Sequence, residues 1–95
     1  MIEVLEFRLA AGVEEDQFLT ADRRVQVEFA YQQPGLQRRT TARGTDGHWI
    51  VVDLWRSAEE ADSSEARWGL DQVCQEFMGL LDPSTVRTRR YFELD

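Results

Sequence analysis

The chain has 95 residues, 42% of them hydrophobic and 31% charged, with a formal net charge of −7. These values predict a single small folded domain over residues 1–95 and exclude a wholly disordered chain. The acidic balance argues against a nucleic-acid-binding protein, because such proteins usually present a basic surface. The sequence has no apolar run long enough for a membrane span, no signal-peptide features and only one cysteine, Cys74, so we expect a cytoplasmic protein.

The first part of the chain predicts a strand followed by a helix. Apolar side chains alternate over residues 2–9, which is typical of a strand. From residue 13 to about residue 31 they recur with helical spacing, and acids crowd the first turn, where the helix dipole favours negative charge. Asp22 lies inside the apolar stripe of this helix, which is an unusual place for a carboxylate. Pro34 and Gly35 then predict a turn.

A β-hairpin is predicted next, with strands near residues 36–44 and 48–55. Asp46 and Gly47 lie between these strands, and this dipeptide is typical of a two-residue type I′ turn, which needs positive φ at both central positions. The second strand contains WIVVDLW and is apolar at almost every position. Such a strand is expected to be buried on both faces.

A second helical region is predicted over residues 58–80, with an interruption around residues 63–69. Ser57 and Glu60 match a capping box at its start. Its second half places several apolar residues on one face: Leu70, Val73, Cys74, Phe77, Leu80 and Leu81. A last and more polar strand is expected over residues 85–94.

The order of elements, β-α-β-β-α-β, predicts an α+β protein with the ferredoxin-like fold. In that fold a four-stranded antiparallel sheet has the strand order 4-1-3-2, and both helices cover one face. The composition agrees with this order. The first and third strands are apolar on both faces, as central strands are, whereas the second and fourth carry arginines that discourage uncontrolled pairing at a sheet edge.

The predicted turn also determines which side chains share a face. A two-residue turn pairs Thr40 with Asp53 and Arg38 with Trp55, and it places these residues with Trp49 on the face away from the helices. Two tryptophans on a bare sheet would make a larger apolar patch than a small monomer usually exposes. We therefore expect a homodimer in which the bare sheet faces of two copies pack together.

The same tryptophan-rich face is a candidate binding site. We expect Arg38 to pair with Asp53 near Trp55, unless a β-bulge shifts the register and brings Arg39 inward instead. Trp49 and Trp55 would then supply apolar walls for a small molecule. The alternative is that the tryptophans form dimer core and that the charges are satisfied ion pairs within it.

A second candidate site lies between the first helix and the sheet. Asp22 is expected to meet an arginine such as Arg39 or Arg90, either as a structural ion pair or as a proton acceptor at the mouth of a pocket. Tyr31 and Tyr91 could hydrogen-bond a ligand there. The simpler interpretation is that both tyrosines are packing residues with solvated hydroxyls.

Four stretches of the chain resemble the dimeric α+β barrel superfamily, which includes the antibiotic-biosynthesis monooxygenase-like domains. They are FLTADRRVQ at 18–26, QPGLQRRTTARG, WIVVDLW and the ending RYFELD. The resemblance implies a homodimer whose two sheets face each other and a pocket between helices and sheet. Members of the superfamily include cofactor-independent monooxygenases acting on polycyclic aromatics, haem-degrading enzymes, decarboxylases and isomerases, and for many members no activity is known. The resemblance therefore implies one of several activities. The haem-degrading and quinone-forming members commonly use Asn, and this chain contains no asparagine, so neither residue set transfers whole.

Two functions follow from these patterns. The first is a homodimer without a cofactor that binds a small apolar or aromatic molecule, or serves only as a stable dimeric module. The second is a cofactor-independent monooxygenase-like enzyme acting on an aromatic or polyketide-type substrate, with Asp22 and Asp53 as candidate catalytic residues. No metal site is expected, because one histidine and one cysteine cannot supply a zinc ligand set. His48 is expected to be an exposed hairpin residue and Cys74 a buried, inert thiol.

Overall fold

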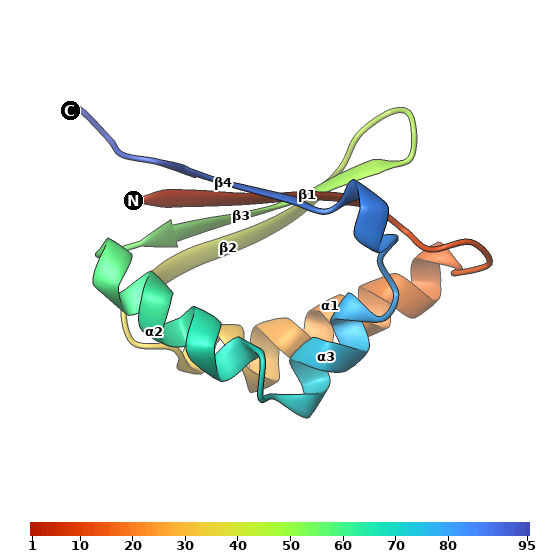
Figure 1. The fold of residues 1–95 in the computed structure, drawn as a ribbon, viewed down its shortest axis with the longest axis horizontal. Helices are drawn as coiled ribbons and strands as arrows, with labels where there is room; N and C mark the ends of the chain where they lie inside the picture. The colour runs from red at the N-terminus through yellow and green to blue at the C-terminus, as the bar shows by residue number, and fades with distance from the viewer.

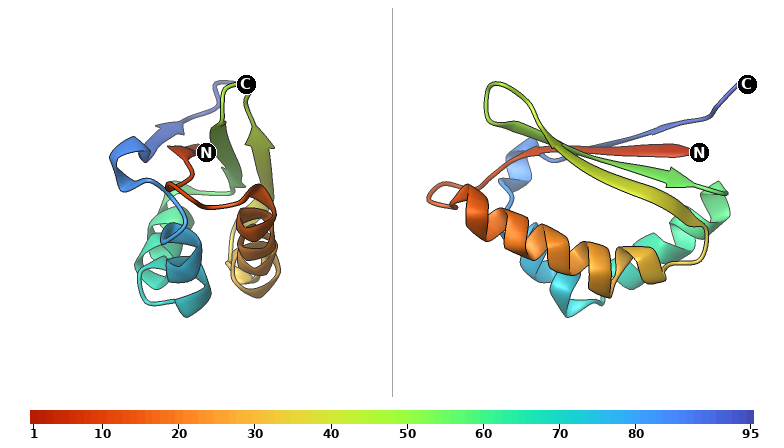
Figure 2. Two further views of the ribbon diagram at one scale, coloured as in Figure 1. Left: turned by 90° about the vertical axis from the view of Figure 1, so that its right-hand side faces the viewer. Right: turned by 180° about the vertical axis from the view of Figure 1, so that it is seen from behind.

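The computed structural model describes all residues from 1 to 95 as one sheet covered by helices (Figure 1). The strands are β1 (Ile2–Arg8), β2 (Leu36–Arg43), β3 (His48–Trp55) and β4 (Arg87–Tyr91). The helices are α1 (Glu15–Glu28), α2 (Ala58–Trp68) and α3 (Gln72–Met78). The strands are antiparallel in the order β2-β3-β1-β4, and the helices form a second layer on one face (Figure 2). The predicted ferredoxin-like α+β fold is therefore confirmed.

The second helical region is divided later than predicted. α2 continues to Trp68, and α3 begins after Asp71, whose side chain accepts a hydrogen bond from the Cys74 N–H at 3.0 Å. This N-cap satisfies a free N–H and starts a new helix. Leu70 falls in the break and is 89% exposed, so its predicted place on the apolar face is wrong. None of the helices is long and apolar enough to cross a membrane.

The hairpin turn contains three residues rather than the two predicted. The Gly44 N–H donates to the His48 carbonyl at 2.6 Å, which leaves residues 45–47 as the turn. Only Gly47 has a positive φ, at 83°, whereas a type I′ turn needs two such residues. A three-residue loop with a left-handed glycine at its end is another common hairpin geometry. The pairing of β2 with β3 is consequently shifted by one residue.

The shifted register turns Arg39 rather than Arg38 toward the helices. Asp53 lies opposite Arg39, and Leu54 lies opposite Arg38. The ladder is irregular between Leu36 and Arg38, as expected where a strand contains a β-bulge. The expected pair of Arg38 with Asp53 is therefore wrong. Arg39 lies inward, as in the alternative register, but the three-residue turn rather than a β-bulge causes the shift.

The tryptophans of β3 face the helices, and the prediction that they lie on the bare face of the sheet is wrong. Trp49 lies opposite Phe7 of β1, and paired side chains share a face. Trp49 and Trp55 are each 5% exposed. The intervening side chains of β1 and β3 form the bare face, where five half-buried residues are aliphatic: Ile2, Val4, Ile50, Val52 and Leu54.

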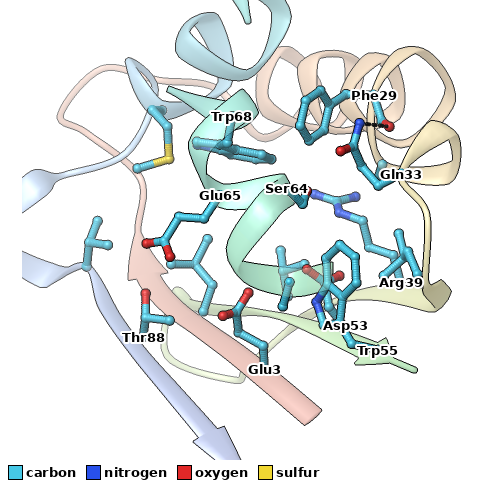
Figure 3. A pocket seen from close by; sticks show the side chains of 17 residues that line it. Glu3, Phe29, Gln33, Arg39, Asp53, Trp55, Ser64, Glu65, Trp68 and Thr88 are labelled. Atoms are coloured by element: carbon cyan, nitrogen blue, oxygen red, sulfur yellow. Dashed lines mark hydrogen bonds between the residues drawn. The ribbon is translucent and has the colours of Figure 1, made fainter. Parts of the chain in front are cut away.

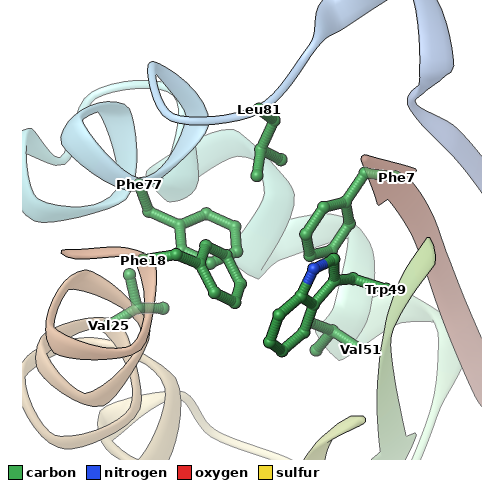
Figure 4. Packing of buried hydrophobic residues seen from close by; sticks show 7 residues of the cluster. All are labelled: Phe7, Phe18, Val25, Trp49, Val51, Phe77 and Leu81. Carbon is green, nitrogen blue, oxygen red and sulfur yellow. The ribbon is translucent and has the colours of Figure 1, made fainter. Parts of the chain in front are cut away.

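An aromatic core fills the space between the sheet and helices α1 and α3 (Figure 4). Phe18 contacts the rings of Trp49 and Phe77, with centroid separations of 4.8 and 5.4 Å that are typical of favourable aromatic pairs. The buried residues of this core are Phe7, Phe18, Val25, Trp49, Val51, Phe77 and Leu81. The core occupies the end of the sheet near the hairpin turn, and it leaves the other end to a different set of side chains.

Candidate functional site

A cavity of about 250 Å³ lies between the sheet and α2, at the end of the sheet away from the hairpin turn. It is lined by 17 residues, 10 of them hydrophobic. The strands form its floor, and α2 together with the segment after α1 forms its roof (Figure 3). A largely apolar cavity with a few converging polar groups is the usual form of a small-molecule site.

A row of four charged residues crosses the sheet beneath this cavity. Arg39 of β2 lies opposite Asp53 of β3, and Asp53 lies opposite Glu3 of β1. Glu3 in turn lies opposite Arg90 of β4. All four side chains belong to the helix-facing side, because residues paired across strands share a face. Two carboxylates therefore lie at the centre of the row, with one guanidinium at each outer position.

The guanidinium of Arg39 is bound to α1 rather than to Asp53. It donates to Asp22 Oδ1 at 2.7 Å and to Gln26 Oε1 at 3.4 Å, and it lies 5.8 Å from the centre of the Phe77 ring. The Arg39 and Asp22 side chains are only 2% and 10% exposed. An unpaired charge at such a depth would be strongly destabilising. Asp22 therefore acts as the structural partner of Arg39, and it does not line the cavity.

Asp53 is the carboxylate without a partner. Its Oδ1 atom is buried and accepts no hydrogen bond from any protein group. Burial raises the pKa of Asp53 from 3.8 to about 6; the Arg39 charge opposes this rise, and the charges of Glu3 and Asp22 add to it. A carboxyl group that titrates near neutral pH, inside a cavity, is suited to accept or donate a proton.

Trp55 forms an aromatic wall of the cavity and also has an unpaired polar atom. Its Nε1 atom is buried and has no hydrogen-bond partner in the protein, although a buried indole N–H usually has one. The ring packs against Met1 and Ala61. Further aromatic surface comes from Trp68 and Phe29, whose rings meet edge-on with centroids 5.6 Å apart (Figure 3).

Arg90 joins β4 to α2 at one side of the cavity. Its guanidinium donates to Glu3 Oε2 at 2.8 Å and to Asp62 Oδ1 at 2.6 Å, and it lies 3.8 Å from Glu65 Oε2. Asp62 and Glu65 are exposed, so these ion pairs contribute little to stability. Their effect is positional: Glu3 is held by Arg90, and Asp53 is left as the free carboxylate of the row.

The structure brings three of the sequence-predicted residues together at the cavity, namely Arg39, Asp53 and Trp55. Tyr31 lies outside the cavity. Its hydroxyl donates to the Arg39 carbonyl at 3.2 Å and accepts from the Arg39 N–H at 3.0 Å. The tyrosine therefore pairs both backbone groups of Arg39 at the open edge of β2. Trp49 belongs to the aromatic core and lines no part of the cavity.

The remaining candidates lie away from the cavity. Arg38 and Tyr91 are exposed and belong to the bare face of the sheet. His48 is half-buried beside the hairpin turn, and Cys74 is fully buried, where burial raises the pKa of its thiol to about 12 and leaves it unreactive. No three His, Cys, Asp or Glu side chains gather in a way that could hold a metal ion.

Two cavity residues were missed by reasoning from the sequence, although the pattern contains a signal for both. Glu3 is two residues before Leu5 on β1, so strand alternation places both side chains on the same face, and both line the cavity. Trp68 follows Ala61 and Ser64 at helical spacing, and all three line the cavity. The wrong assignment of the tryptophans of β3 to the bare face drew attention away from both residues.

Known proteins resemble this chain in structure rather than in sequence: no family model matches it, and no curated protein matches it by sequence. SnoaB, a cofactor-independent oxygenase from Streptomyces nogalater, is similar with a TM-score of 0.81 and 18% identity over 99% of this chain and 92% of its own. Rv0793 from Mycobacterium tuberculosis has a TM-score of 0.73 and 13% identity, over 99% of this chain and 94% of its own. A candidate antibiotic biosynthesis monooxygenase from Nitrosomonas europaea has a TM-score of 0.67 and 8% identity, over 99% of this chain and 98% of its own.

The fold and the matching structures agree. The protein has the ferredoxin-like α+β fold, and its predicted resemblance to antibiotic-biosynthesis monooxygenase-like proteins is confirmed at the level of the fold. Because the sequence identities are only 8–18%, the similarity to these structures establishes the fold alone.

Proposed function

We propose that the cavity between the sheet and α2 binds a small apolar or aromatic molecule. The observation that supports this function is the cavity itself, which has aromatic walls at Trp55 and Trp68 and polar atoms of Asp53 and Trp55 without protein partners. A side-chain-filled space between helices and sheet, as in the aromatic core, would offer no room for a ligand.

A thermal-shift screen of small aromatic molecules tests this function, because a ligand that binds only the folded protein raises its apparent stability. Ser64 is buried on α2 and lines the cavity, whereas the neighbouring Ser63 is exposed. We expect Ser64→Phe to fill the cavity and abolish the shift that a hit produces. Ser63→Phe is the matched control and should keep the shift. The absence of any hit, or a hit that binds both variants equally, contradicts the proposal.

We also propose that the protein is a homodimer, although the basis differs from the expectation. The tryptophans lie beneath the helices, and the bare face instead presents a patch of aliphatic side chains centred on Val4 and Val52. A second copy packed against this face would remove the patch from water. The resemblance to the dimeric α+β barrel proteins implies the same arrangement.

Light scattering on the purified protein at micromolar concentration tests the assembly. We expect a particle of twice the chain mass of 11.1 kDa. Val52→Lys places a charge on the bare face and should give a monomer. Leu70→Lys changes a leucine that is 89% exposed in the break between α2 and α3, and it should leave the dimer intact. A stable monomer of the unmodified protein overturns the proposal.

A second candidate function is cofactor-independent oxygenation of an aromatic or polyketide-type substrate. It is favoured by the similarity to SnoaB, which is a cofactor-independent oxygenase, and by Asp53 in the cavity. With a pKa of about 6, the Asp53 carboxyl is mostly ionised at neutral pH and can take the proton of a substrate hydroxyl. The electron-rich substrate anion would then react with dioxygen, so the substrate supplies most of the chemistry.

Oxygen uptake with a panel of hydroxylated polycyclic aromatics tests the second function. We expect enzyme-dependent uptake that is lost in Asp53→Asn, because the amide cannot accept the proton. Glu59→Gln neutralises an exposed acid on α2 and should retain the activity. Binding of aromatics without oxygen uptake would leave the first function and exclude this one for the compounds tested.

A further inference from the structure

Two residues that line the cavity each have a buried polar atom without a protein partner, and the two atoms are of opposite kinds. Asp53 Oδ1 is a hydrogen-bond acceptor, and Trp55 Nε1 is a donor. Both residues line the same cavity and lie two positions apart on β3, so their side chains leave the sheet on the same face. Trp55 is only 5% exposed, which makes an unsatisfied indole N–H costly.

We infer that these two atoms form a polar subsite for the hydroxyl group of an uncharged aromatic ligand, so that the preferred ligands are phenol-like. The inference rests on the proposed binding function of the cavity and specifies its ligand class. A hydroxyl is both a donor and an acceptor: its O–H bonds to Asp53 Oδ1, and its lone pair accepts from Trp55 Nε1. One group on the ligand therefore satisfies both atoms.

The charges at the cavity exclude other ligand classes. Three acids line it, Glu3, Asp53 and Glu65, against one guanidinium, that of Arg39. Arg39 is already bound to Asp22 at 2.7 Å and is not free to bind a ligand anion. A carboxylate or phosphate ligand would consequently meet repulsion without a compensating partner.

An ammonium ligand satisfies only half of the subsite. It can donate to Asp53, but it has no lone pair to accept from Trp55 Nε1. A ligand with an ether or a carbonyl as its only polar group has the reverse defect, because it leaves Asp53 without a donor. The aromatic surfaces of Trp55 and Trp68 suit a planar apolar body attached to the hydroxyl.

Equilibrium dialysis with two probes of nearly equal shape tests the subsite. The probes are 2-naphthol, which carries the hydroxyl, and 2-methylnaphthalene, which replaces it with a methyl group. The measured quantity is the ratio of their dissociation constants, which cancels changes in general affinity. We expect Trp55→Phe to reduce the preference for 2-naphthol by about tenfold, because a hydrogen bond to the ligand is lost while most of the ring is kept.

Two further variants complete the test. Asp53→Leu removes the acceptor at similar volume and should reduce the same preference by about tenfold or more, because the lost bond involves a charged group. Trp49→Phe makes the same change as Trp55→Phe at an equally buried tryptophan of the same strand outside the cavity, and it should leave the ratio unchanged. Circular dichroism confirms that each variant is folded.

The outcomes separate the subsite from the binding function on which it rests. If both probes bind the unmodified protein and the ratio is the same in Trp55→Phe and Asp53→Leu, the cavity binds aromatics and the hydroxyl subsite is wrong. If 2-naphthoate binds more tightly than 2-naphthol, the ligand class is anionic and the inference also fails. If none of the probes binds, the binding function fails together with it.

Discussion

Trp49 and Trp55 lie on the same strand, face the same helix layer and are each 5% exposed, yet their surroundings differ completely. Trp49 is packed against Phe18 in the aromatic core, at the end of the sheet near the hairpin turn. Trp55 lies at the cavity end, beside an unpartnered carboxylate and with its own N–H unpaired. Equal burial therefore conceals two environments, one filled by packed aromatic rings and one beside a cavity.

The comparison indicates how a small domain holds both a packed core and a cavity. The core end brings together aromatic rings from β1, β3, α1 and α3, which stabilise the fold. The cavity end has the charged row of the sheet, which includes a buried acid with a raised pKa. The packing that stabilises the fold is thus concentrated at the core end, whereas the cavity end contains charged groups whose burial opposes folding.

The first prediction compares a phenylalanine from each end. Phe77 is fully buried and contacts other rings of the core, whereas Phe29 is 6% exposed and borders the cavity. We expect Phe77→Ala to lower the free energy of unfolding by about 5 kcal/mol and Phe29→Ala by about 3 kcal/mol, because less packed surface surrounds the second ring. Urea denaturation measures both values, and equal losses would show that the two ends are packed alike.

The second prediction concerns the ion pair that joins the two ends. Asp22→Leu leaves the buried guanidinium of Arg39 without its carboxylate, and we expect a loss of about 3 kcal/mol in the free energy of unfolding. The double variant Asp22→Leu with Arg39→Met removes both charges and should recover most of this loss. If the double variant is as unstable as the single variant, the cost comes from packing rather than from an unpaired charge.

The third prediction uses the titration of Asp53. The folded protein binds a proton at Asp53 with a pKa of about 6, whereas the unfolded chain does so near 3.8. The contribution of Asp53 to the free energy of unfolding is therefore most favourable below pH 3.8, the pKa of the group in the unfolded chain. This contribution is lost as the pH rises through about 6, the pKa of the group in the folded protein. The difference corresponds to on the order of 3 kcal/mol against folding above neutral pH.

Asp53→Asn removes this titration. We expect the variant to be more stable than the unmodified protein by about 2 kcal/mol near pH 8, with the difference shrinking toward pH 4. Urea denaturation at a series of pH values measures it. Glu59→Gln, which changes an exposed acid, should show no such convergence. If the difference in the free energy of unfolding between Asp53→Asn and the unmodified protein is the same at every pH, burial does not raise the pKa of Asp53.

The fold could be predicted from the sequence because each element has its own local signal. The alternation of β1, the helical spacing of α1 and the composition of the edge strands all agree with one topology. The faces of the sheet could not be assigned in the same way. β3 is apolar on both sides, with tryptophans on one and Ile50, Val52 and Leu54 on the other, so alternation does not indicate which side meets the helices.

The candidate site was only partly predictable for the same reason. Asp46 and Gly47 fit two hairpin geometries that differ by one residue, and the choice decides whether Arg38 or Arg39 faces Asp53. Asp53 was expected to pair with Arg38, because a buried carboxylate without a partner is costly. That expectation failed because Asp53 lines a cavity and is buried with a raised pKa rather than paired.

The smallest expected effect concerns the helix caps above the two ends. Ser57 caps α2 over the cavity, and Asp71 caps α3 over the aromatic core. The side chain of each residue accepts a hydrogen bond from a backbone N–H in the first turn of its helix. Ser57→Ala and Asp71→Ala should each lower the free energy of unfolding by about 1 kcal/mol. Hydrogen exchange should distinguish them, because local opening is easier where fewer packed contacts must break. We expect Ser57→Ala to accelerate exchange within α2 alone and Asp71→Ala to affect the whole core. The reverse pattern would mean that α2, and not the core, limits global unfolding.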